Sequence, residues 1–170
     1  MPDNEHKPIR KSAPPKRDWS SGNEAKYYSY REAWARIKIA QKLGFYLEAV
    51  TIEESILSDR MLSYLIKTRS LILKDKVRNS FGLTLQEWSN LIQKADSCDE
   101  AEQDLCKRID DWRQSRNATV HGMVKSSVGH KEDHITDFLL AAKTAAAQGE
   151  KLARELDRWV RSTQAKSTKK

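Results

Sequence analysis

SCDEAEQDLCKRIDDWRQSRNATVHG, residues 97–122, is the stretch that decides the fold. Ser97 and Glu100 form a capping-box pattern, and acidic residues follow in the first turn, where the helix dipole favours them. Apolar residues then recur at three-to-four spacing, which is typical of an amphipathic helix. Gly122 predicts its end. We therefore expect a helix from about 97 to 121 that buries Ala101, Leu105, Ile109, Trp112 and Val120.

The rest of the chain outside its first residues has the same helical periodicity. Helices are predicted over about 23–43, ended by Gly44, and over about 45–79, with Gly82 as a C-cap glycine. Thr84 and Glu87 predict the capping box of a short helix, and a last helix is expected over about 132–162. No strand-like alternation is present. The predicted fold is therefore all-α, an antiparallel helical bundle of four long helices plus one short helix.

Composition divides the chain into three parts. All four prolines fall in the first fifteen residues, so residues 1–22 are predicted to be a flexible basic arm, residues 23–162 a helical domain, and residues 163–170 a disordered basic tail. The formal net charge is +7, but residues 1–22 contribute +2 and residues 161–170 contribute +4, so the remainder is almost neutral. Bulk charge is therefore weak evidence for nucleic-acid binding.

Several classes of protein are disfavoured by the sequence. There is no run of about 20 apolar residues that could span a bilayer and no apolar signal-peptide core, so we expect no membrane association and a cytoplasmic location. Cys98 and Cys106 are accordingly expected to be reduced thiols.

The residues Arg116-Asn117-Ala118-Thr119-Val120-His121, followed by Gly122, are the one segment that indicates chemistry. An arginine can balance the charge of a crowded phosphate, and a histidine can exchange protons near neutral pH, which is what RNA cleavage without a metal needs. Arg116 and His121 are about 140° apart around a helix, whereas Asn117 and His121 share a face that Arg113 extends. A site could form if Arg116 reaches around the helix, or if two subunits bring their motif helices together.

The segment resembles the Arg, four to six residues, His signature of the HEPN family. The resemblance extends to residues 44–61, which look like the family's second helix, and to residues 83–92, which look like its short connecting segment. It covers roughly residues 25–159 in the family's element order. Met61 stands where the family usually has Leu, which is a volume-conserving change.

The resemblance implies a metal-independent endoribonuclease of a bacterial toxin or phage-defence system, acting on RNA as a homodimer, with an antitoxin or another protein as a possible partner. By the same resemblance Arg116 would stabilise the phosphorane, His121 would act as general base or acid, and Asn117 would orient the phosphate or the imidazole. The products would carry 2′,3′-cyclic phosphate and 5′-hydroxyl ends. Glu54 and Arg60 match the family pattern as supporting residues, and we interpret both as structural.

Other interpretations stay open at this point. A non-catalytic HEPN module could bind a partner protein or RNA, because the bundle survives when the site is idle. Alternatively, the motif is accidental in a helical adaptor, and Arg116 and His121 only satisfy helix-end carbonyls or acids such as Asp111 or Glu100. His130 and His134 are four apart, but they lack a third ligand at a defined spacing, so no metal or other cofactor is expected.

Overall fold

The computed structural model describes residues 22–69, 75–95, 98–124 and 133–167, and within these ranges the chain is helical with no strand, which confirms the all-α prediction. Four helices are long: α1 (Gly22–Leu43), α2 (Tyr46–Arg69), α5 (Glu100–Val124) and α6 (Asp133–Ser167). Two are shorter, α3 (Asp75–Arg78) and α4 (Phe81–Gln93). None of the helices in these ranges is both long and apolar enough to cross a bilayer.

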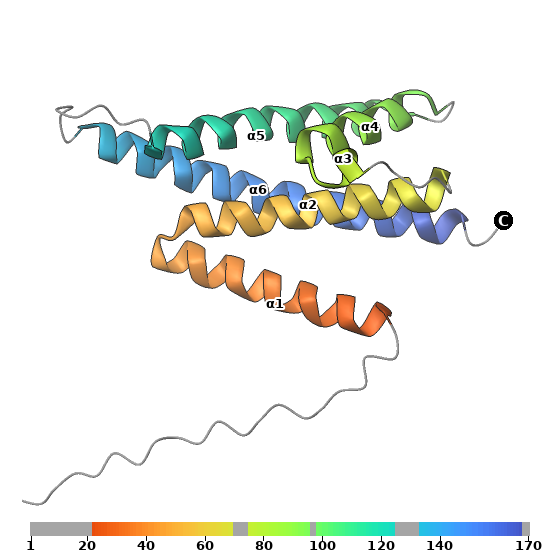
Figure 1. The fold of residues 1–170 in the computed structure, drawn as a ribbon, viewed down its shortest axis with the longest axis horizontal. Helices are drawn as coiled ribbons and strands as arrows, with labels where there is room; N and C mark the ends of the chain where they lie inside the picture. Colours follow the sequence, from red (N-terminus) through yellow and green to blue (C-terminus); the bar gives the residue numbers. More distant parts are fainter. Residues whose placement is uncertain (1–21, 70–74, 96–97, 125–132, 168–170) are drawn as a thin grey trace, which may run out of the picture.

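The long helices lie side by side, and successive ones run in opposite directions (Figure 1). α2 makes its most extensive contact with α6, and α6 also packs along α5. α1 packs mainly on α2, while α3 and α4 cover the region between α2 and α5 (Figure 1). One end of the bundle therefore brings together the α1–α2 turn, the end of α5 and the start of α6.

The core is formed by the apolar stripes of five helices, and its largest fully buried side chains include Trp88, Trp112 and Met61. α6 contributes small residues at its crossing with α2 and α5. A Cβ at Gly149 would lie 2.2 Å from Glu53 Oε2 and 2.8 Å from Trp112 Cζ2. α6 therefore approaches α2 and α5 closely at this glycine, because only hydrogen fits beneath these two side chains.

Gly44 ends a helix as predicted, whereas several other helix ends differ from the prediction. Gly44 ends α1 with a φ of +81°, the left-handed conformation that favours glycine at this position. The described part of α2 ends at Arg69, residues 75–78 of its predicted span form the separate α3, and Gly82 lies inside α4 and not after a helix. The N-cap of α4 is Ser80, whose side chain accepts a hydrogen bond from Leu83 N.

The start of α5 also differs from the prediction. Asp99 Oδ1 accepts a hydrogen bond from Glu102 N at 2.8 Å, and Asp99 N donates to Glu102 Oε2 at 3.4 Å. The capping box is thus formed by Asp99 and Glu102, two residues later than the predicted pair. Ala101 is consequently exposed, whereas Leu105, Ile109 and Trp112 are buried as expected. At the other end α5 continues past Gly122 to Val124, and α6 continues five residues past its predicted end at 162.

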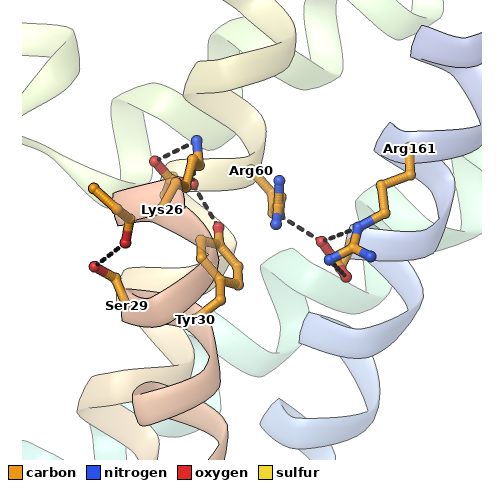
Figure 2. A network of polar contacts seen from close by, with 8 residues as sticks. Lys26, Ser29, Tyr30, Arg60 and Arg161 are labelled. Carbon is orange, nitrogen blue, oxygen red and sulfur yellow. Dashed lines mark hydrogen bonds and ion pairs between the residues drawn. The ribbon is translucent and has the colours of Figure 1, made fainter. Parts of the chain in front are cut away.

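A network of charged and aromatic side chains joins α1, α2 and α6 (Figure 2). Tyr30 donates its phenolic hydrogen to Asp59 at 2.5 Å, and Arg60 lies over the Tyr30 ring with its Cζ 4.0 Å from the ring centre. Arg60 also pairs with Asp157 of α6 at 2.6 Å, and Asp157 pairs with Arg161 at 3.0 Å. Burial and the neighbouring carboxylate raise the pKa of Tyr30 far above its usual range, so the phenol stays protonated.

Candidate functional site

Arg116 lies on the side of α5 that faces the bundle, one turn after the buried Trp112. The Trp112 indole N–H donates to the Ala145 carbonyl of α6 at 2.8 Å, and its ring meets Phe81 of α4 edge to face. These contacts anchor α5 just before the motif. The position of the Arg116 Cα is therefore fixed by core packing and not by a loop.

The Arg116 guanidinium bridges two helices. Its Nη2 pairs with Glu54 Oε2 of α2, and its Nη1 donates to the Asn117 side-chain carbonyl. The Arg116 and Glu54 side chains retain 22% and 21% of their exposed area, so the pair is partly buried but reachable from solvent. Burial lowers the pKa of Arg116, yet a guanidinium stays charged at any physiological pH.

His121 lies one turn after Asn117, in the last part of α5, and is exposed. Among the described residues it makes no hydrogen bond or ion pair, and none links it to Arg116. Thr119, between them, is buried and donates its hydroxyl to the Ser115 carbonyl at 2.9 Å, so it only satisfies the helix backbone. Among the described residues, the motif thus supplies a guanidinium that is ion-paired and an imidazole that has no partner.

The supporting residues divide. Glu54 joins the motif by its ion pair with Arg116, a contact that no spacing within α2 could predict. Arg60 does not, because it belongs to the α1–α2–α6 network (Figure 2). Arg113 is held by Asp110 at 2.8 Å, and this contact lowers the pKa of the Asp110 carboxyl. The acids suggested as alternative partners, Asp111 and Glu100, form no ion pair with Arg116 in the described part of the chain.

Glu53, the neighbour of Glu54, is a buried acid outside the motif. It is 0% exposed beneath Gly149, and its Oε1 accepts a hydrogen bond from Gln41 at 3.3 Å. Burial raises its pKa to about 8, which the Gln41 hydrogen bond opposes and the charge of Glu150 supports. Glu53 is therefore neutral at pH 7, and it faces α6 as Arg60 does, seven residues on.

No group of three or more metal-binding side chains occurs among the residues that the structure describes. His130 lies outside those residues, and the position of the His134 side chain is also not described. Nothing in the described part of the chain provides a phosphate loop or a metal centre near Arg116.

One end of the bundle brings together the α1–α2 turn, the end of α5 and the start of α6 (Figure 1), and large apolar side chains of these segments are exposed; His121 lies near the end of α5. We call this end of the bundle the apolar end and define it by five residues, each between 47% and 63% exposed: Leu43, Phe45, Ile135, Leu139 and Leu140. Phe45 and Leu139 border a common cavity of about 350 Å³ between α2 and α6. Exposed apolar clusters of this kind usually mark an interaction surface.

Comparison with known proteins assigns no function to this site. No protein-family model matches the chain, and neither a curated protein nor a solved structure matches it.

Proposed function

We propose that the chain is a metal-independent endoribonuclease of HEPN type, from a bacterial toxin or phage-defence system, that works as a homodimer. The observation that carries the proposal is the arrangement around Arg116: a guanidinium held by Glu54 and Asn117 at a partly exposed position, with an exposed histidine at the end of the same helix. These are the two groups that phosphodiester cleavage requires, a fixed cation and a free proton carrier.

The reaction needs no co-reactant. A base removes the proton of the ribose 2′-hydroxyl, the 2′-oxygen attacks the adjacent phosphorus, and the bond from phosphorus to the 5′-oxygen breaks. An acid returns a proton to that leaving oxygen. The products are a 2′,3′-cyclic phosphate and a 5′-hydroxyl. Arg116 stabilises the charge on the pentavalent phosphorus, and Asn117, already bonded to Arg116, orients the phosphate or the imidazole.

The motif provides one histidine per chain, His121, which is too few for both proton transfers in a single step. A dimer provides two. The exposed His121 lies at the same end of the bundle as the five residues of the apolar end. If two chains pair through their apolar ends, their His121 side chains come close to each other. Among the residues that the structure describes, His121 is exposed and has no ion pair, which is what such an arrangement requires.

The test is RNA degradation in EDTA by purified protein and its variants. His121→Ala should abolish cleavage while helicity and dimer mass stay unchanged, and His134→Ala, a histidine change outside the motif, should leave cleavage intact. Mass spectrometry should find 2′,3′-cyclic phosphate ends. Equal cleavage by wild type and His121→Ala would refute the proposal.

A second candidate is a non-catalytic HEPN module that binds RNA or a protein. One observation favours it: the charge of Arg116 is already balanced by Glu54, and no contact in the described residues brings His121 to it. A protein that stays inactive toward RNA yet shields RNA from an added ribonuclease, or is captured as a stable complex with one protein partner, would support this candidate. Wild-type toxicity on overexpression that Arg116→Ala relieves would instead favour the enzyme.

A further inference from the structure

A groove between α1 and α6 combines positive charge with aromatic rings. It is a cavity of about 450 Å³, and its lining includes four cationic side chains, three aromatic rings and no carboxylate. Its residues are Tyr27, Tyr30, Arg31, Trp34, Ala35, Lys38, Arg154 and Arg161. The groove is distinct from the Arg116 site, since the Arg116 ion pair joins α5 to α2.

The cations of the groove differ in how strongly they are held. Arg154 pairs with Glu150 at 2.7 Å, and Arg161 pairs with the buried Asp157. Arg31 and Lys38, one on each side of Trp34 in α1, are exposed and form no ion pair within the described ranges. Since the body of the chain is almost neutral, this concentration of cations is local.

The rings offer stacking surfaces. Tyr27 is 63% exposed. The Arg154 guanidinium lies over the Trp34 ring, with its Cζ 4.2 Å from the ring centre, and both residues line the groove. Tyr30 is less available, because its hydroxyl is bound to Asp59 and Arg60 covers its ring.

The groove is tied to the rest of the bundle by two of its residues. Tyr30 and Arg161 line it, and both belong to the network that ties α1 to α2 and α6 (Figure 2). These contacts join the two helices that line the groove, so part of its lining is ordered before any ligand arrives.

We propose that this groove binds single-stranded RNA at a site separate from the Arg116 motif. A single strand offers both phosphates for the free cations and base faces for the rings, and this pairing of charge with aromatic stacking is how proteins hold single strands. An acidic peptide would match the cations but leave Tyr27 unused. From Tyr27 to Lys38 the helix rises about 16 Å, the length of roughly five phosphates in a stacked strand. The choice of RNA over DNA rests on the proposed ribonuclease function, because the charge and the rings of the groove do not distinguish the two.

The test is fluorescence anisotropy of a labelled twelve-nucleotide U strand in EDTA, with His121→Ala protein so that nothing is cleaved. Arg31→Glu with Lys38→Glu should weaken binding at least ten-fold and should lower the slope of log Kd against log salt by about 1.4, since each lost phosphate contact removes about 0.7. Tyr27→Ala should weaken binding roughly five-fold or more, and Tyr27→Phe, which keeps the ring, should not. Lys94→Glu with Lys107→Glu, exposed lysines of α4's end and α5, is the matched charge control.

The proposal is overturned if the control weakens binding as much as the groove pair, or if the strand does not bind at low salt. Equal affinity for twelve-residue poly-glutamate, with no effect of Tyr27→Ala, would assign the groove to an acidic peptide. Tighter binding of a T strand of DNA would overturn the choice of RNA. Groove-dependent binding by a protein that never cleaves RNA refutes the proposed function alone, and His121-dependent cleavage without groove-dependent binding refutes this proposal alone.

Discussion

Glu53 gives a prediction that can be tested directly, because its carboxyl group lies in the core and forms no ion pair with any of the described residues. It is 0% exposed, its Oε2 has no hydrogen-bond partner among the described residues, and Gly149 and Trp112 close over it. The Gln41 amide is its one hydrogen-bond donor. Replacing the carboxyl with the neutral, similarly shaped amide in Glu53→Gln therefore removes a titration and little packing.

The magnitude follows from linkage. The pKa of Glu53 rises from 4.5 to about 8 on folding. Below pH 4.5 the group is protonated in both states and costs nothing. Between pH 4.5 and about 8 only the unfolded chain ionises, so unfolding releases a proton and stability falls as pH rises, by about 1.4 kcal/mol per unit. The loss amounts to roughly 5 kcal/mol over that window and then levels off.

The assay is urea unfolding followed by circular dichroism at pH 5, 6.5 and 8, for wild type and Glu53→Gln side by side. All other ionisable groups are common to the two proteins, so their contributions cancel in the difference. Glu53→Gln should gain on wild type by about 4 kcal/mol between pH 5 and pH 8. Two stability curves that run parallel, within about 1 kcal/mol, would refute the argument that this carboxyl is held neutral.

Three further predictions concern packing and charge. Gly149→Ala should lower stability by about 1–3 kcal/mol, because the new methyl meets Trp112, whereas Gly82→Ala, in open space, should be neutral or stabilising; thermal melts compare the two, and equal melting temperatures would contradict the close approach. Asp157→Asn should lower the free energy of unfolding by about 3 kcal/mol, measured with urea, because the 11%-exposed guanidinium of Arg60 loses its full counter-charge. A decrease below about 0.5 kcal/mol would refute this. In a double-mutant cycle of Glu54→Ala and Arg116→Ala, the coupling should be about 1–3 kcal/mol, and additive effects would mean that the pair does not form.

Local sequence signals predicted a helix end correctly where the backbone can adopt only one conformation. They failed where two positions in the sequence satisfy the same capping pattern. Gly44 was predictable because its backbone has a positive φ, which side chains disfavour. The capping-box pattern occurs both at Ser97–Glu100 and at Asp99–Glu102; the second is formed, and Ser97 lies outside the described residues. No rule of spacing distinguishes the two patterns, because either start leaves Leu105 and Ile109 on the buried face of α5.

The overlong prediction for α2 has a related cause. Residues 45–79 contain neither proline nor glycine, so nothing in the local sequence marks a stop. The turn before α4 is instead stabilised by a contact that is not a helix signal: the buried Thr84, predicted as an N-cap, donates its hydroxyl to the Val77 carbonyl at 2.7 Å. A residue suited to capping was used to join α3 to α4.

The candidate site was half predictable. Arg116, Asn117 and His121 are close in sequence, and their helix could be assigned from its periodicity. Glu54 lies on another helix, and its partnership with Arg116 depends on how α2 and α5 are placed around α6. The α1–α6 groove was not predictable for the same reason, since Trp34 and Arg154 meet only after folding.

The adjacent acids Glu53 and Glu54 show how one turn of α2 serves two purposes. They point about 100° apart, so one is sealed against α6 while the other reaches the Arg116 guanidinium of α5. Glu53→Gln is therefore a matched control for Glu54→Gln: both replace one carboxyl by one amide at neighbouring positions. At pH 5, where Glu53 is neutral, only Glu54→Gln removes a charge beside the motif. An effect on RNA cleavage or binding that Glu54→Gln has and Glu53→Gln lacks belongs to the Arg116 pair, and an effect common to both belongs to the packing of α2.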